Sequence, residues 1–302
     1  MRVFSPQPSE EAKEQWARRA AGRTRGDAMR SSSEVRRGVA RVAALAAAGW
    51  LLVATLPAHA AWGRRVGEPF HWSGSLAAGK ILEVKGVNGP IRAVAASGNV
   101  ASVDARKTSR RNDPDEVKIE VIESEDGIMI CARYPKLWGG LTDCEGGGGS
   151  MRNSDVNVDF EVRVPAGVRF VARSVNGEIE AEGLRSEVSA ATVNGSVRIA
   201  TSRHAEAKTV NGSIHARLGA GDWRQDLEFA TVNGAIELEL PAGLDADLSA
   251  ATVNGEIESD FPLQVTGRLG RHRVHGTIGK GGRQLRLATV NGGIHLTRLG
   301  SL

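Results

Sequence analysis

The sequence predicts an all-β protein in which short strands stack as parallel coils, that is, a single-stranded β-solenoid of Val-Asn-Gly coils. Three observations support this prediction. The tripeptide Val-Asn-Gly recurs along the chain, the residues around it match from copy to copy, and the segments between copies alternate between apolar and polar residues. A period of two, rich in β-branched residues, is typical of strands rather than helices.

The repeat occurs seven times as Asn-Gly and once in a degenerate form. The Asn-Gly pairs are Asn88-Gly89, Asn176-Gly177, Asn194-Gly195, Asn211-Gly212, Asn233-Gly234, Asn254-Gly255 and Asn291-Gly292. We interpret His275-Gly276, within the segment RVHGTIG, as the degenerate copy. Counted from Asn176, the spacings are then 18, 17, 22, 21, 21 and 16 residues, which is a solenoid-like period.

Equivalent positions of the repeat carry equivalent residues. The residue before Asn is always Val, the third residue after it is Ile or Val, and Thr stands two residues before it in five of the eight copies. Antiparallel hairpins would require matching flanks within a copy rather than identity between copies. Parallel stacking instead places each residue over its equivalent, about 4.8 Å away. We therefore expect inward ladders of Val and Ile, a ladder of Asn amides, and positive φ angles at the turns.

We expect the β-solenoid domain to span residues 61–302 and its regular repeats to span 173–298. No copy occurs between Asn88 and Asn176, but apolar alternation there predicts strands at 81–87, 91–95, 117–122, 128–134 and 156–164. The Gly-rich segment 135–155 predicts a loop before the last of these strands. This loop is either an interaction feature on a rigid scaffold or a flexible insertion.

The first 60 residues differ from the rest of the chain. The apolar stretch 42–56 follows three arginines and precedes a small-residue cleavage site, so residues 29–60 predict a cleaved signal peptide. The alternative is a retained anchor, which would need about 20 apolar residues. We expect residues 1–28 to be a non-native or disordered extension and Met29 to be the natural start. The exported chain would then reach the periplasm, the envelope or the medium, without stable insertion in a membrane.

The basic character of the sequence lies in this leader. Residues 1–60 carry 10 of the 39 Lys and Arg residues and 5 of the 35 Asp and Glu residues, so residues 61–302 have a formal net charge of −1. A nearly neutral domain lacks the electrostatic signature of a nucleic-acid-binding protein. We therefore predict no nucleic-acid partner.

The chain has two cysteines, Cys131 and Cys144, and both follow the leader. In an oxidising compartment such a close pair predicts a disulfide, which stabilises an unstrained fold by roughly 3 kcal/mol. A metal site would require additional thiols or histidines at suitable spacing. We therefore predict that the chain has no metal site.

The fourth residue after each Asn defines a candidate binding face. Its members are Arg92, Glu180, Arg198, His215, Glu237, Glu258 and His295. In a stacked solenoid they project outward as a mixed-charge ladder, which is either a solvated face or a stripe that binds a ligand.

No sequence motif indicates catalysis. The chain has no nucleophile elbow, phosphate loop or HExxH motif, and we predict no catalytic residue, metal or cofactor. His272 and His275 are three residues apart, which places them on opposite faces of a strand. A β-helix enzyme that cleaves acidic polysaccharides is the catalytic alternative, although Asp245 and Asp247 have the pattern of ordinary outward residues.

The segments GKILEVKGVNGPIRAV and VRVPAGVRF and the serial TVNG copies resemble the DUF4097 family over about residues 66–298. The resemblance implies an exported or envelope-associated protein, a right-handed β-helix, and membership of a family of candidate adhesins. The function we expect from it is non-catalytic adhesion or scaffolding, with an envelope polymer or surface protein as partner. Besides the polysaccharide-active enzyme, the alternative is an envelope-stress-associated partner of a membrane protein. The sequence does not indicate an oligomeric state.

Overall fold

The computed structural model describes residues 64–144, 151–220, 223, 225–265 and 272–300. All of them belong to the compact unit Ala58–Leu302. The predicted signal peptide and the extension 1–28 lie outside the described residues. Within those residues no helix has the length and apolar character to cross a bilayer. The short 3-10 helix η1 (Pro114–Glu116) precedes β6.

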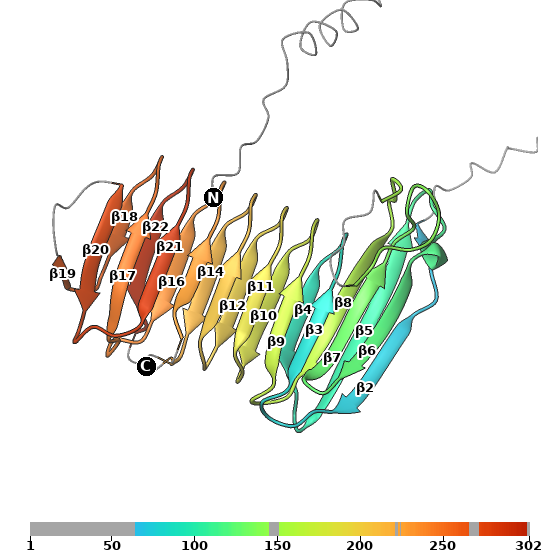
Figure 1. The fold of residues 1–302 in the computed structure, drawn as a ribbon, viewed down its shortest axis with the longest axis horizontal. Helices are drawn as coiled ribbons and strands as arrows, with labels where there is room; N and C mark the ends of the chain where they lie inside the picture. Colours follow the sequence, from blue (N-terminus) through green and yellow to red (C-terminus); the bar gives the residue numbers. More distant parts are fainter. Residues whose placement is uncertain (1–63, 145–150, 221–222, 224, 266–271, 301–302) are drawn as a thin grey trace, which may run out of the picture. The chain divides into compact units, whose positions relative to one another are not determined.

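The strands form two sheets of eleven strands each (Figure 1). Sheet A has the order β1 (Arg65–Val66), β5 (Val100–Ser109), β8 (Asn157–Val164), β4 (Ile91–Ala95), β10 (Ile179–Leu184), β12 (Val197–Thr201), β14 (Ile214–Leu218), β16 (Ile236–Leu240), β22 (Ile294–Arg298) and β18 (Ile257–Ser259), with β2 (Phe70–Ser75) also paired to β5. Sheet B has the order β19 (Leu263–Val265), β20 (Arg273–Ile278), β17 (Ala246–Ala251), β21 (Gln284–Ala288), β15 (Leu227–Ala230), β13 (Ala205–Lys208), β11 (Val188–Ala191), β9 (Arg169–Arg173), β3 (Ile81–Lys85), β7 (Gly127–Arg133) and β6 (Lys118–Ser124).

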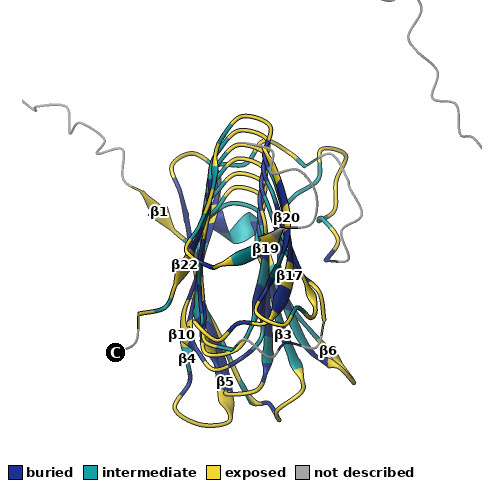
Figure 2. Cartoon of the chain, turned by 90° about the vertical axis from the view of Figure 1, so that its left-hand side faces the viewer, coloured by how far each residue is buried: buried dark blue, intermediate teal, exposed yellow. Residues whose placement is uncertain are grey.

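The two sheets lie face to face and enclose one hydrophobic core (Figure 2). From β9 to β16 the chain alternates between sheet B and sheet A, and each strand pairs in parallel with its equivalent in the next coil. Equivalent residues are in register, as in the row Ile179, Val197, Ile214 and Ile236. The all-β prediction is confirmed, with two large sheets, whereas the hand of the coil stays a prediction.

At both ends of the stack a coil is inserted out of chain order. Strands β3 and β4 lie between the coil of β7 and β8 and the coil of β9 and β10. Strands β21 and β22, the last of the chain, lie between the coil of β15 and β16 and the coil of β17 and β18. At the ends, therefore, the coils do not stack in sequence order. Coils with the same side-chain pattern can take each other's place, because each offers the same surface to its neighbours.

The degenerate copy was wrongly interpreted as a turn. His275 and Gly276 lie inside β20, which pairs antiparallel with both β17 and β19. The Val-His-Gly sequence resembles the Val-Asn-Gly repeat, but it lies within a strand and has an extended backbone. Gly276 therefore does not belong to the turn ladder, and the coils of the stack carry seven Asn-Gly turns.

In six of the seven coils the valine that precedes Asn points outward, contrary to our expectation of an inward Val ladder, whereas Val87 in the coil of Asn88 is half-buried against the core. Exposed fractions are 39% for Val175, 40% for Val193, 39% for Val210, 38% for Val232, 60% for Val253 and 38% for Val290. The inward positions are the Ile or Val three residues after Asn, such as Ile214 at 0% exposure, and the Thr two residues before it, such as Thr209 at 5%. Side chains alternate along the chain, so an inward Thr places the following Val outside the corner.

Glycine is required at most of these turns by close stacking and not by positive φ. Among the seven Asn-Gly turns, only Gly89 (φ +111°) and Gly292 (φ +158°) have positive φ. A Cβ atom built on Gly195 would overlap the carbonyl oxygen of Gly177, and the same contact recurs from coil to coil. The adjacent Thr hydroxyl donates to the equivalent carbonyl: Thr209 Oγ1 lies 2.9 Å from the oxygen of Gly195. The backbones therefore stack with no room for a side chain.

Candidate functional site

The side chains of the seven Asn residues form one hydrogen-bonded ladder along the Asn-Gly edge, which we define as the edge of the stack where the seven Asn-Gly turns lie. The parallel bridges at Asn place each amide over the next. Nδ2 donates to Oδ1 of the neighbouring coil from Asn254 to Asn291 (2.8 Å), Asn291 to Asn233 (2.7 Å), Asn233 to Asn211 (2.8 Å), Asn211 to Asn194 (2.8 Å), Asn194 to Asn176 (2.7 Å) and Asn176 to Asn88 (2.9 Å). All these bonds point the same way, which favours cooperative polarisation along the row.

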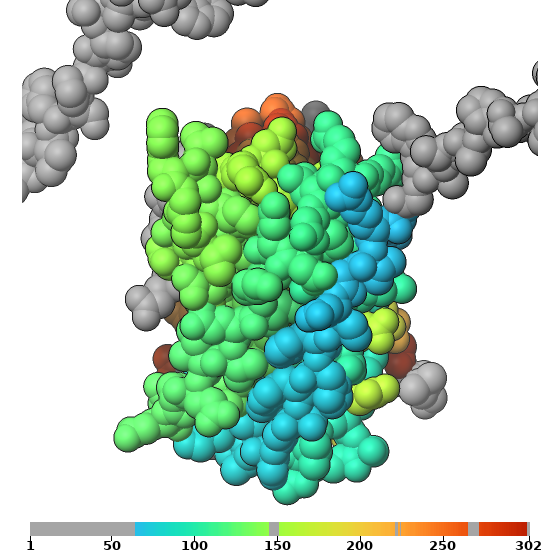
Figure 3. All heavy atoms as spheres, turned by 90° about the vertical axis from the view of Figure 1, so that its right-hand side faces the viewer, coloured from blue at the N-terminus to red at the C-terminus, as the bar shows by residue number. Residues whose placement is uncertain are grey.

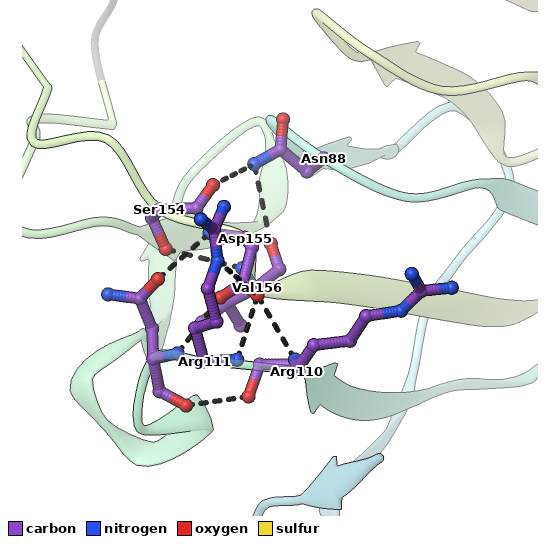
Figure 4. A network of polar contacts seen from close by, with 8 residues as sticks. Asn88, Arg110, Arg111, Ser154, Asp155 and Val156 are labelled. Atoms are coloured by element: carbon purple, nitrogen blue, oxygen red, sulfur yellow. Dashed lines mark hydrogen bonds and ion pairs between the residues drawn. The ribbon is translucent and has the colours of Figure 1, made fainter. Parts of the chain in front are cut away.

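The ladder ends at Asn88 in a polar network (Figure 4). Nδ2 of Asn88 donates to the carbonyl oxygens of Ser154 (3.4 Å) and Val156 (3.3 Å). The hydroxyl of the buried Tyr134 lies 3.3 Å from the carbonyl oxygen of Asn88 and 3.2 Å from that of Val156. Burial raises the pKa of Tyr134, so its hydroxyl stays a donor at ordinary pH. The first amide of the ladder thus has partners on the side that no further Asn covers.

Asp155 holds the neighbouring chain segment to this network. Its carboxylate accepts hydrogen bonds from the backbone N–H groups of Asn112 (3.0 Å), Arg111 (2.9 Å) and Arg110 (3.1 Å) (Figure 4). These bonds, with that of Asn112 the largest contribution, lower the pKa of Asp155. The end of β5 is therefore tied to the start of β8 by one ionised side chain.

The predicted cysteine pair joins the loop between β7 and β8 to β7. Cys131, in β7, and Cys144 form a disulfide. The loop is also fixed by isolated bridges from Pro135 to Leu141 and from Lys136 to Met151. Residues 145–150 of the predicted Gly-rich segment lie outside the described residues. The described part of the loop is therefore a braced turn.

The structure brings all seven residues of the predicted binding face into one row on the outer side of sheet A. The order across the strands is Arg92, Glu180, Arg198, His215, Glu237, His295 and Glu258. Neighbouring members form ion pairs or hydrogen bonds: Arg92 with Glu180 (3.1 Å), Arg198 with Glu180 (3.3 Å), His215 with Glu237 (2.9 Å) and His295 with Glu258 (3.1 Å). Arg198 and His215 are the one pair of neighbours in the row without a carboxylate between them.

A second row, two residues further along each strand, completes the site and was missed from the sequence. It contains Glu182, Ala200, Arg217, Glu239 and Thr297. Arg217 pairs with Glu239 at 2.7 Å, and this carboxylate raises the pKa of Arg217. The sequence signal that could have found this row is the sixth residue after each Asn, since period-two alternation returns it to the same face.

The two rows surround a hollow of about 620 Å³ in the outer face of sheet A. Ala200 stands where the next two coils carry Arg217 and Glu239, and its small side chain leaves the space open. Four of the seven predicted residues line the hollow, namely Arg198, His215, Glu237 and His295, whereas Arg92, Glu180 and Glu258 do not. The lining offers cationic donors and carboxylate acceptors side by side, which suits hydroxyl-rich ligands. In the part of the chain that the structure describes, no group of three or more His, Cys, Asp or Glu side chains is placed to hold a metal ion.

Fold and site together define a class of protein: an all-β stack of parallel coils with an open, polar outer face. The family model described as Toastrack DUF4097 matches residues 143–297. This match covers just over half of the chain, and the chain belongs to the DUF4097 family, which confirms the resemblance.

Comparison with solved structures gives similarities at low identity. A structure from Clostridium sporogenes ATCC 15579, named a "putative cell adhesion protein", is 9% identical, with a TM-score of 0.40 over 77% of this chain and 100% of that one. A "putative adhesin" from Bacteroides fragilis NCTC 9343 is also 9% identical, with a TM-score of 0.34 over 77% of this chain and 97% of that one. No curated protein sequence matches the chain.

Proposed function

We propose that this protein is an exported, non-catalytic β-solenoid of the cell envelope, with right-handed coils, that binds an extended envelope polymer across the outer face of sheet A. Adhesion and scaffolding are the roles that such binding serves. The observation that carries the proposal is the hollow around Ala200, whose polar lining comes from consecutive coils in register.

The regular spacing of the face supports a polymer rather than a small ligand. Side chains repeat about every 4.8 Å across parallel strands, so a chain-like ligand lying across the coils meets similar groups at successive positions. Each contact with an exposed charged side chain is weak. Several contacts made together by one polymer give useful affinity through effective concentration.

The charges in the hollow support binding over catalysis. A glycosidase needs one protonated carboxylic acid and one carboxylate, set apart by their surroundings. Here Glu239 pairs with Arg217 and Glu237 pairs with His215, and both carboxylates lie on the open outer face. Neither carboxylate is enclosed in an apolar pocket of the kind that sets an acid apart from a nucleophile. The hollow therefore offers hydrogen-bonding groups to a ligand.

The test is retention on insoluble envelope polymers, together with a search for products. Residues 61–302, which contain every described strand, would be incubated with a panel of neutral and acidic polysaccharides. Pull-down and new reducing or unsaturated ends would then be measured. We expect retention without product, and about tenfold weaker retention for the double variant Arg198→Ala, Arg217→Ala.

A matched control is available on the opposite sheet. Lys208→Ala combined with Arg286→Ala removes the same charge from two exposed positions of the outer face of sheet B, and it should retain normal binding. Equal retention of the two double variants would show that the hollow is not the binding site. Product formation that depends on Glu237 or Glu239 would show that the protein is a polysaccharide-active enzyme instead.

A further inference from the structure

We infer that the N-terminal end of the Asn-Gly edge is a contact surface for a lipid bilayer, with Leu137 and Trp138 as its anchor. The contact is peripheral and involves no membrane-spanning segment. It goes beyond the proposed polymer binding, because it uses a different surface and a different class of partner. Four observations carry it: an exposed aromatic tip, the brace beneath that tip, the cations at the same end of the edge, and a row of outward valines along the same edge.

The tip of the loop between β7 and β8 exposes two neighbouring apolar side chains. Trp138 is 90% exposed and Leu137 is 55% exposed, which makes Trp138 the most exposed large hydrophobic residue in the described part of the chain. A tryptophan in this position gives up most of the burial that its ring could gain, typically 150–250 Å². An exposed apolar pair on a surface loop marks an interaction site rather than a folding requirement.

The turn that carries this pair is braced, so the tip cannot easily fold back to cover its own side chains. Lys136 N–H donates to the carbonyl oxygen of Gly140 (3.0 Å), and Gly139 N–H donates to that of Lys136 (3.3 Å). The two glycines take positive φ angles of +92° and +76°, which glycine adopts at low cost. The Cys131–Cys144 disulfide and the ion pair of Lys136 with Asp143 (3.0 Å) hold the base of the loop.

Cations and a further exposed valine lie at the same end of the edge. Tyr134, three residues before Leu137, reaches Asn88, and Asn88, Arg64 and Arg110 line one hollow of about 470 Å³. Arg64, Arg65 and Arg110 are exposed, and within the described ranges Arg65 and Arg110 have no ion-pair partner. Val66, beside Arg65, is 66% exposed. Arginines next to exposed apolar residues suit the anionic headgroups and the acyl boundary of a bilayer.

A row of outward valines also lies along the Asn-Gly edge, and it begins one coil beyond the half-buried Val87. The residues Val175, Val193, Val210, Val232, Val290 and Val253 follow one another from coil to coil, each at least 38% exposed. Side chains in such a row are about 4.8 Å apart. Beside each valine lies an Asn amide, a polar group suited to the headgroup region. The row extends the contact beyond a single inserted residue.

A bilayer fits this surface better than a sugar or a protein pocket does. Leu137 and Trp138 expose neighbouring apolar side chains, and an inserted apolar pair gains burial in the acyl region of a bilayer. Amphipathic tryptophan rings favour the membrane interface.

The test is vesicle flotation with residues 61–302, which lack the apolar leader, so that any binding belongs to the folded domain. Vesicles of phosphatidylcholine alone would be compared with vesicles that contain about 30% phosphatidylglycerol, which gives a clearly negative surface. We expect the protein to float with the anionic vesicles. The double variant that combines Leu137→Ala with Trp138→Ala should bind them with at least about tenfold weaker apparent affinity. High salt should weaken the binding of the unaltered protein in part.

Two controls separate this result from misfolding and from polymer binding. Val100→Ser changes a 54% exposed valine at the start of β5, on the opposite edge of the stack, and should float as the unaltered protein does. The Leu137, Trp138 variant should keep its thermal midpoint, because both side chains are mostly exposed. The Arg198, Arg217 variant should still float, so that failure of the polymer proposal and failure of this one can be told apart.

Fluorescence supplies a direct reading of the tip. Adding anionic vesicles should shift the tryptophan emission to the blue, and the shift should be absent in Trp138→Phe. The inference is overturned if the unaltered protein floats with neither vesicle, or if the Leu137, Trp138 variant floats equally well. It is also overturned if emission from Trp138 responds to a polysaccharide but not to vesicles, which would assign the tip to the polymer.

Discussion

The middle and the ends of the stack use the same side-chain pattern but different rules of order. From β10 to β16 the coils follow one another along the chain, and each pairs in parallel with the next. At the ends, the coil of β3 and β4 and the coil of β21 and β22 are inserted between others. The difference teaches that the Val-Asn-Gly pattern fixes which residue lies over which. It does not fix which coil lies over which.

Antiparallel strands then distinguish the ends from the middle. At one end β5 pairs antiparallel with β8, and β6 with β7; at the other, β20 pairs antiparallel with β17. Figure 3 shows the first of these ends, covered by the segment of β2 in blue and the strands that follow β4 in green. An uncovered strand edge offers unpaired backbone groups to other chains, and terminal caps of this kind are needed in stacked repeats.

The largest effect should come from filling the backbone contact between middle coils. Gly195→Ala places a Cβ atom against the carbonyl oxygen of Gly177, and the stacked backbones must separate. In Gly276→Ala, at the C-terminal end, the nearest atom is the carbonyl oxygen of Gln264 at 3.3 Å. We expect a loss of about 3 kcal/mol in the free energy of unfolding for Gly195→Ala and less than about 1 kcal/mol for Gly276→Ala.

Thermal unfolding measures this difference directly. For a domain of this size the expected gap in midpoint between the two variants is roughly 5–10 °C. Equal midpoints would mean that the coils in the middle can separate as easily as the cap, and the comparison between the two regions would fail.

A smaller effect on stability should come from the hydroxyl groups of the Thr residues that stand two positions before Asn. Thr209→Val removes the donor to the carbonyl oxygen of Gly195 in the middle of the stack, and should cost about 1–2 kcal/mol because that acceptor is left without its partner. Ser174 occupies the equivalent position in the coil of β9 and β10, near the N-terminal end. Its buried hydroxyl has no hydrogen-bond partner among the described residues, so Ser174→Ala should be neutral or stabilising.

Urea unfolding of the two variants gives the measurement, since midpoint shifts at a constant slope report stability. A loss for Ser174→Ala as large as that for Thr209→Val would show that the row acts through packing. In that case the hydrogen bond would not be the reason why Thr recurs at this position.

The register of the stack could be predicted from the sequence because parallel pairing brings identical residues together. The same argument predicted the Asn ladder and the row from Arg92 to Glu258. The coil order could not be predicted, because Asn254 and Asn291 have the same neighbours in sequence and either could follow Asn233. The outward Val was missed because a β-branched residue suits a strand whichever way it faces. Strand β5, with Lys107 and Thr108 among its buried residues, lacks a clean alternation and was not predicted.

The hollow around Ala200 could not be predicted for a different reason. Its lining depends on which coils are neighbours, and His295 of β22 faces Glu237 of β16 only because the last coil is inserted there. In sequence order, Glu258 would have taken that place. The inserted coil therefore changes the chemistry of the site as well as the order of the stack.

The smallest effect concerns how the N-terminal end responds to acid. Backbone hydrogen bonds, that of Asn112 first, lower the pKa of Asp155 below its ordinary value of 3.8. A lowered pKa in the folded state means that the ionised group adds stability above pH 3.8, and that this contribution disappears as the pH falls through the folded-state value. Asp155→Asn should therefore be less stable than the unaltered protein at pH 7, and this difference should shrink as the pH falls below 3.8. Denaturant midpoints measured across this range test the sign.

Asp126→Asn is the matched control, because the Asp126 side chain accepts no hydrogen bond among the residues that the structure describes, and its effect should be small at every pH. A stability difference for Asp155→Asn that stays the same from pH 7 to 2.5 would contradict the lowered pKa of Asp155.

Hydrogen exchange gives a second measurement of this variant. Exchange should become faster at Arg110, Arg111 and Asn112, whose N–H groups donate to the carboxylate, and should stay the same at the amides of β12 and β14. Faster exchange throughout the stack would mean that this end governs the stability of the middle, since a cap that opens only locally cannot change the protection of distant coils.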